Sequence, residues 1–152
     1  MRKASYPALL VSLMALPLLA QADIEGVKSG EQMAREASAQ VTSIHTDELK
    51  NHLLSEPELV LVDIRTPGEI RGMGGAIASP KNVNIPRGWL EYRIGQYTLG
   101  KDTPIVVYCG ADYRSPLAAD TLQRMGYTNV SSYADGYLGW RKAGLPTELP
   151  AE

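Results

Sequence analysis

Runs of apolar residues, separated by turn-forming residues, divide this chain into alternating strand and helix candidates. Residues 59–64 and 104–108 are almost continuously apolar, which is typical of strands buried on both faces of a parallel sheet. Shorter strand candidates lie at 41–45, 82–85 and 129–133. Strands that alternate with helices in this way predict an α/β domain with a largely parallel sheet.

The helices between these strands are predicted from polar starts and from glycine or proline ends. Thr46 is the expected N-cap of a helix that runs to about Leu54, and Gly126 ends a helix expected from Ser115 to Met125. Further helix candidates lie at 28–40, 87–97 and 137–142. Residues 66–86 are rich in glycine and proline, so we expect an irregular connection around the strand at 82–85.

The first 22 residues are organised as a secretory signal peptide. Arg2 and Lys3 form a basic start, residues 8–20 are largely apolar, and Ala20-Gln21-Ala22 has the small-x-small form that signal peptidase cleaves. The apolar stretch is shorter than the roughly 20 residues that span a bilayer. We therefore expect cleavage after Ala22, no stable membrane insertion, and a periplasmic or secreted protein.

Behind this signal we expect an N-terminal helical extension at 23–40 and one domain at 41–148. The chain is 44% hydrophobic and 21% charged, which is a globular composition. Its formal charge of −2 and its lack of basic runs argue against nucleic-acid binding. His45 and His52 lie far from other ligand-type clusters, so no metal site is expected.

Cys109 is the single cysteine of the chain, so it forms no internal disulfide. A buried, inert thiol is one interpretation. Its neighbours favour a reactive one, because Cys109 directly follows a buried strand and a helix begins six residues later, with Ser115 as the expected N-cap and Pro116 at the first helical position. A sulfur that faces a helix N-terminus lies beside unpaired N–H groups and a positive dipole end, which favour a thiolate.

The loop that joins Cys109 to this helix is short enough for its amides to surround one additional atom on the sulfur. Arg114 adds a permanent positive charge there. Asp63 and Arg65 follow the other buried strand, and we expect them near the same edge of the sheet in a supporting, structural role.

The segment from Cys109 to Ser115 resembles the active-site loop of the rhodanese family of single-domain sulfurtransferases. Segments 61–69, 83–86 and 133–140 resemble three further motifs of that family, in the family's order. The resemblance extends from about Val41 to Leu145. It implies a rhodanese-like α/β fold, in which a five-stranded, mostly parallel sheet is flanked by helices.

The resemblance also implies an activity that needs no cofactor and no metal. Cys109 would be the nucleophile that takes a sulfur atom from thiosulfate, polysulfide or a persulfide, carries it as a persulfide, and passes it to a thiol or cyanide. The residues implied to bind donor and sulfur are Gly110, Ala111, Asp112, Tyr113, Arg114 and Ser115. Within this set Arg114 would close the loop and attract an anionic donor, whereas the acidic Asp112 would oppose dianionic thiosulfate.

Other interpretations stay open at this point. One is a periplasmic sulfur carrier or polysulfide-binding module that turns over little without a protein partner. Another is a rhodanese-like phosphatase or arsenate reductase, although the related enzymes of that type use a loop one residue longer. The family also commonly has Gly-His-Ile where this chain has Gly75-Ala76-Ile77, so that region is expected to differ. Trp89, Tyr92 and Tyr97 are expected in the core, with a dimer or partner surface as the alternative.

Overall fold

Five parallel strands form the main sheet of the computed structural model, which describes residues 26–149. The strand order is β1-β6-β5-β2-β4. Their bounds are β1 Thr42–Ile44, β2 Val60–Asp63, β4 Asn82–Asn84, β5 Ile105–Tyr108 and β6 Val130–Tyr133. Every residue of β2 and β5 is buried, because these two apolar strands lie inside the sheet and are covered on both faces. The predicted α/β fold is confirmed.

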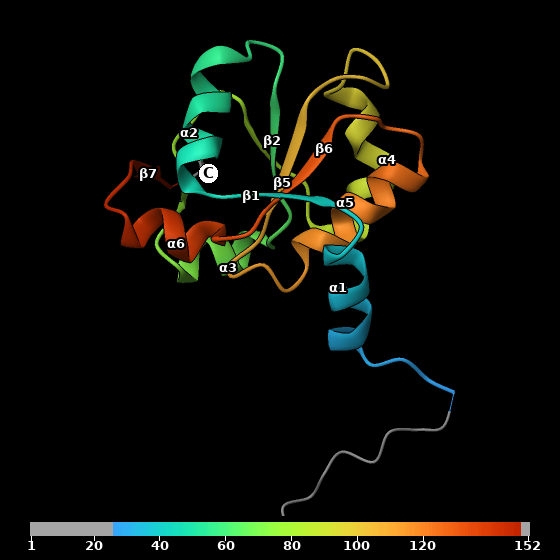
Figure 1. The fold of residues 1–152 in the computed structure, drawn as a ribbon. Coiled ribbons are helices and arrows are strands. Elements are labelled where there is room, and N and C mark those ends of the chain that lie inside the picture. The colour runs from blue at the N-terminus through green and yellow to red at the C-terminus, as the bar shows by residue number, and fades with distance from the viewer. Residues whose placement is uncertain (1–25, 150–152) are drawn as a thin grey trace, which may run out of the picture.

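Helices cover both faces of the sheet (Figure 1). They are α1 Gly30–Ser38, α2 Thr46–Ser55, α3 Pro67–Gly72, α4 Leu90–Arg93, α5 Ser115–Arg124 and α6 Gly136–Lys142. One core cluster joins the sheet to apolar residues of α4 and α5, and a second joins it to residues of α2 and α6. The α1 helix packs on α5 (Figure 1). This arrangement leaves the carboxyl ends of β2 and β5 next to the first turns of α3, α5 and α6.

The segment that was expected to be irregular contains a helix and a second, small sheet. Thr66 caps α3: its hydroxyl accepts from the Glu69 amide, and the Glu69 carboxylate accepts from the Thr66 amide. This capping box, with Pro67 in the first turn, starts a helix despite two glycines nearby. Further along, β3 (Ala76–Ile77) pairs antiparallel with β7 (Thr147–Glu148).

The predicted helix at 87–97 is broken into a 3₁₀ turn (Arg87–Trp89), α4 and a second 3₁₀ turn (Ile94–Gln96). The prediction that its aromatic residues pack in the core is wrong. Trp89, Tyr92 and Tyr97 are 54%, 80% and 41% exposed. Leu90 and Ile94, four residues apart on one helical face, take the buried positions instead.

Two helix starts differ by one residue from the prediction. Thr46 and Ser115 are the first residues of α2 and α5, and His45 and Arg114 occupy the N-cap positions. Pro116 is therefore the second residue of α5, not the first. No helix within residues 26–149 has both the length and the apolar character needed to cross a membrane. The predicted signal peptide at 1–22 lies outside the described residues.

Candidate functional site

Cys109 lies immediately after β5 and is only 1% exposed. It belongs to the core cluster that also contains Ala118 and Ala119 of α5. The sulfur-bearing residue is thus held by core packing at the base of the loop.

The start of α6 holds the first two peptide groups of the loop in place. The Tyr137 amide donates to the Cys109 carbonyl at 2.9 Å, and the Leu138 amide donates to the Gly110 carbonyl at 3.0 Å. Each of these carbonyls belongs to a planar trans peptide, so the N–H of the same peptide points the opposite way. The amides of Gly110 and Ala111 therefore point away from α6.

The loop amides as a group have no acceptor in the part of the chain that the structure describes. Within residues 26–149, none of the N–H groups of residues 110–114 donates a hydrogen bond to the chain. Asp112 turns the loop through a left-handed conformation (φ +60°), which aspartate tolerates better than most residues. Successive amides in such a turn form a concave anion-binding nest. The loop is therefore equipped to stabilise negative charge next to Cys109.

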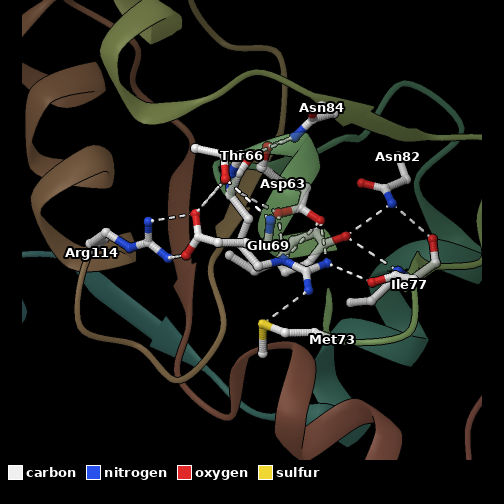
Figure 2. A network of polar contacts seen from close by, with 11 residues as sticks. Asp63, Thr66, Glu69, Met73, Ile77, Asn82, Asn84 and Arg114 are labelled. Atoms are coloured by element: carbon white, nitrogen blue, oxygen red, sulfur yellow. Dashed lines mark hydrogen bonds and ion pairs between the residues drawn. The ribbon is translucent and has the colours of Figure 1, made fainter. Parts of the chain in front are cut away.

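Arg114 connects the loop to α3 through a two-pronged ion pair (Figure 2). Its Nη2 lies 2.6 Å from Oε1 of Glu69 and its Nη1 lies 3.2 Å from Oε2. Arg114 first, and the Thr66 amide next, lower the pKa of the Glu69 carboxyl to about 2. Arg114 thus closes the loop structurally, and a carboxylate balances its charge. Its attraction of a donor stays a prediction. No local sequence pattern indicates this pairing, because 45 residues separate the partners.

Asp112 and two serines form a hydrogen-bonded group beside the sulfur. The Ser115 hydroxyl lies 3.7 Å from Cys109 Sγ and donates to Asp112 Oδ1 at 2.7 Å. The Ser132 hydroxyl donates to the same oxygen at 3.0 Å. Burial raises the pKa of the Asp112 carboxyl, and the two hydroxyls act in the opposite direction. Sequence reasoning missed Ser132, since β6 carries no motif that marks it.

Asp63 and Arg65 form a fully buried ion pair, with Arg65 Nε 2.9 Å from Asp63 Oδ1. The Arg65 guanidinium also donates to the Gly75 carbonyl and lies 4.1 Å from the centre of the Tyr137 ring. Figure 2 shows Asp63 at the end of its strand, inside this polar network. The pair reaches the loop indirectly, because it supports Tyr137, whose amide holds the Cys109 carbonyl.

A groove of about 500 Å³ borders the outer side of the loop. Its lining residues come from α1 and from the loop: Glu31, Ala34, Arg35, Ser38, Asp112 and Tyr113. Tyr113 is 76% exposed, so it lies at the surface and not beside the sulfur. Among residues 26–149 no group of three or more histidine, cysteine, aspartate or glutamate side chains is placed to hold a metal ion.

Comparisons with known proteins identify the family to which this fold belongs. The family model for the rhodanese-like domain matches residues 45–143. A sulfurtransferase of Allochromatium vinosum is 32% identical over 111 residues, which cover 72% of this chain and 97% of that protein.

Two solved structures are also similar. The polysulfide-sulfur transferase homodimer of Wolinella succinogenes is 26% identical, with a TM-score of 0.69 over 79% of this chain and 87% of that one. A Rhodopseudomonas palustris protein of unknown function, described as a possible tyrosine phosphatase, is 33% identical, with a TM-score of 0.68 over 80% of this chain and 95% of that one.

Proposed function

The chain belongs to the rhodanese-like domain family and is a rhodanese-like sulfurtransferase, and from that premise we propose that Cys109 carries the transferred sulfur as a persulfide. The observation that supports this most is the set of unpaired amides at 110–114, which follow the single cysteine directly. Backbone N–H groups fixed around a developing negative charge stabilise it without reorganisation. The outer sulfur of a persulfide carries such a charge.

The reaction proceeds in two balanced steps. In the first, the Cys109 thiolate attacks the outer sulfur of the donor; a bond from Sγ to that sulfur forms, the donor's sulfur–sulfur bond breaks, and the electron pair leaves on sulfite, a thiolate or a shortened polysulfide. In the second, a thiolate or cyanide attacks the outer sulfur, and the electron pair returns to Cys109 as a thiolate. No external oxidant or reductant is consumed.

We propose polysulfide as a better donor than thiosulfate. The charge of Arg114 is balanced by Glu69, and Asp112 adds a carboxylate to the loop, so the field for a compact dianion is weak. Cys109 is 1% exposed, and the narrow end of a sulfur chain needs less room at the sulfur than a tetrahedral oxyanion does. Similarity to the polysulfide-sulfur transferase of Wolinella succinogenes supports the same choice.

We further propose that the protein acts after export, in a periplasm or outside the cell, with cleavage after Ala22. Protein purified from a periplasmic fraction should then begin at Asp23, as intact mass will show. A mass that still includes residues 1–22 would argue against this location.

Mass spectrometry of the exported form tests the chemistry. After incubation with polysulfide the protein should gain one sulfur atom, cyanide should remove it, and Cys109→Ser should not gain it. Failure of the wild-type protein to gain sulfur would refute the proposal. Hydrolysis of an aryl phosphate that depends on Cys109, without sulfur loading, would favour the phosphatase interpretation. Loading without turnover on small acceptors would indicate a carrier that needs a protein partner.

A further inference from the structure

The Ser115 hydroxyl has a fixed hydrogen-bond direction. It lies between Cys109 Sγ, at 3.7 Å, and Asp112 Oδ1, at 2.7 Å. A hydroxyl has one proton, and an ionised carboxylate only accepts hydrogen bonds. The proton of Ser115 is therefore committed to Asp112. Only the lone pairs of the Ser115 oxygen remain for the sulfur, and these can accept from a thiol S–H but cannot stabilise a thiolate.

The carboxylate that sets this direction is itself held in place. Ser132, like Ser115 fully buried, donates to the same oxygen of Asp112 at 3.0 Å. The Asp112 backbone is left-handed, and its carboxylate faces the two serines. Burial raises the pKa of the Asp112 carboxyl, and the two hydroxyl donors on one oxygen oppose this because they favour the ionised form. Asp112 thus acts as a stable acceptor at the end of a chain that begins at Cys109.

The other charged groups near Cys109, Ser115 and Asp112 form ion pairs of their own and do not bind the Ser115 hydroxyl. Arg114 faces Cys109, but its guanidinium is paired with Glu69 at 2.6 Å. His45 and Asp135 face Asp112 from the start of α2 and from the turn before α6, and they pair with each other at 3.0 Å. Within residues 26–149, Asp112 is the acceptor of the one hydrogen bond donated by the Ser115 hydroxyl.

We propose that Asp112 is a positioning residue which controls the reactivity of Cys109 through Ser115: it draws the Ser115 proton away from the sulfur and thereby favours the thiol over the thiolate. This inference rests on the proposed function, in which Cys109 is the nucleophile. It implies that the resting sulfur is less reactive than the loop amides alone would make it. The pH profile of sulfur loading should accordingly lie at higher pH than in the same loop without Asp112.

Two substitutions at Asp112 separate its charge from its role as an acceptor. Asp112→Asn removes the charge and keeps an oxygen that accepts from Ser115, whereas Asp112→Gly removes both. Asparagine and glycine tolerate the left-handed backbone at this position, so neither change strains the loop. The readout is the rate at which iodoacetamide, a neutral reagent, alkylates Cys109 over a range of pH. This rate does not depend on sulfur transfer.

The proposal predicts a larger effect of Asp112→Gly than of Asp112→Asn. We expect the glycine variant to alkylate about tenfold faster than wild type at mildly acidic pH, which corresponds to a shift of the profile by about one pH unit. The alkylation rate of the asparagine variant should rise only about threefold, because its amide oxygen still accepts a hydrogen bond, though a weaker one, from Ser115. Ser131→Ala is the matched control: Ser131 neighbours Ser132 in β6, but its side chain lies on the opposite face of the sheet and, within residues 26–149, forms no hydrogen bond with Asp112, so its alkylation rate should stay close to that of wild type.

The Ser115→Ala background decides whether the effect passes through Ser115. In that background the two Asp112 variants should alkylate at the same rate. Equal rates of the two variants in the wild-type background, an undiminished glycine effect in Ser115→Ala, or no gain in either variant would each overturn the proposal. If the glycine variant does not fold, the gain of Asp112→Asn should still shrink in Ser115→Ala, and an unchanged gain would refute the inference. Absence of persulfide would refute the proposed function instead and leave the alkylation result valid.

Discussion

Gly136 lies directly against Gly110: a Cβ atom on Gly136 would stand 2.7 Å from the Gly110 carbonyl oxygen and 3.0 Å from the Ala111 nitrogen. Gly136 also adopts a left-handed backbone, with φ +58°. It is the first residue of α6, and the next two amides hold the loop carbonyls. The close approach of α6 to the loop thus depends on the missing side chain of one glycine.

The substitution Gly136→Ala should therefore damage both stability and activity. The methyl group must push the loop or α6 aside, which breaks the contacts from Tyr137 and Leu138, and we expect a loss of about 2–3 kcal/mol in the free energy of unfolding. Urea unfolding and the rate of sulfur loading measure the two effects. Gly144→Ala is the control, because Gly144 has φ +70° but no atom within 4 Å of its Cβ position. It should lose only about 1 kcal/mol and load sulfur normally. Equal losses in the two variants would contradict this account.

The substitution Asp63→Asn should be strongly destabilising, since it leaves the fully buried Arg65 guanidinium without its ionic partner. Breaking one side of a buried pair costs about 3–5 kcal/mol, and urea unfolding will measure this. The double variant Asp63→Asn, Arg65→Met removes both charges and should lose less than Asp63→Asn alone. A double variant at least as unstable as the single one would show that the stacking of Arg65 on Tyr137, not the ion pair, carries the stability.

The pairing of Glu69 with Arg114 predicts a specific pH dependence of stability. The folded-state pKa of Glu69 is about 2, below its ordinary value of 4.5, so the pair's contribution is complete above the ordinary value and is lost as pH falls toward about 2. Both partners are partly exposed, so we expect only about 0.5–1 kcal/mol. Wild type and Glu69→Gln should differ in unfolding free energy near neutral pH and converge as the pH is lowered.

Glu48→Gln is the control for the capping contact alone. Glu48 accepts from the His45 amide as Glu69 does from Thr66, but no arginine among residues 26–149 pairs with Glu48. At neutral pH, Glu48→Gln should therefore lower the free energy of unfolding by less than Glu69→Gln does. A difference between wild type and Glu69→Gln that is constant down to low pH would show that the Arg114 pair does not stabilise the fold.

The substitution Arg114→Ala should slow sulfur loading without abolishing it. It removes the link between the loop and α3 and leaves the Glu69 carboxylate without its partner, while Cys109 and the loop amides remain. Loss of this two-pronged but partly exposed contact is worth about 0.5–1 kcal/mol, or roughly twofold to fivefold in the initial rate with polysulfide. Arg114→Lys keeps the charge but loses the two-pronged contact, so its initial rate should lie between those of wild type and Arg114→Ala. A wild-type rate in Arg114→Ala would show that Arg114 does not contribute to sulfur loading.

Continuous apolar runs identified the two central strands, because burial on both faces leaves no polar alternation to obscure them. The same reasoning placed Cys109 at the end of β5. It failed for α3, where glycine and proline content outweighed the Thr66 and Glu69 capping box, a local signal that was present in the sequence. For Trp89 and Tyr92, aromatic character suggested burial, but the four-residue spacing of Leu90 and Ile94 decides which face is inside.

The polar partners of the loop depend on tertiary structure and were not predictable from local pattern. Glu69 meets Arg114 because α3 and α5 begin at the same edge of the sheet. Ser132 reaches Asp112 because β6 lies next to β5. Ser115 was expected to cap a helix, but its hydroxyl donates to Asp112 instead and so links the sulfur to a carboxylate.

The contact between α6 and the loop also concerns the order in which the protein is made. The α6 helix follows every strand of the main sheet in the chain, and its amides hold the Cys109 and Gly110 carbonyls. During translation the cysteine emerges well before the helix that shapes its surroundings. A nascent or truncated chain that ends before Gly136 would thus contain the thiol without the helix that fixes the loop around it, and full reactivity would appear only after α6 has been made.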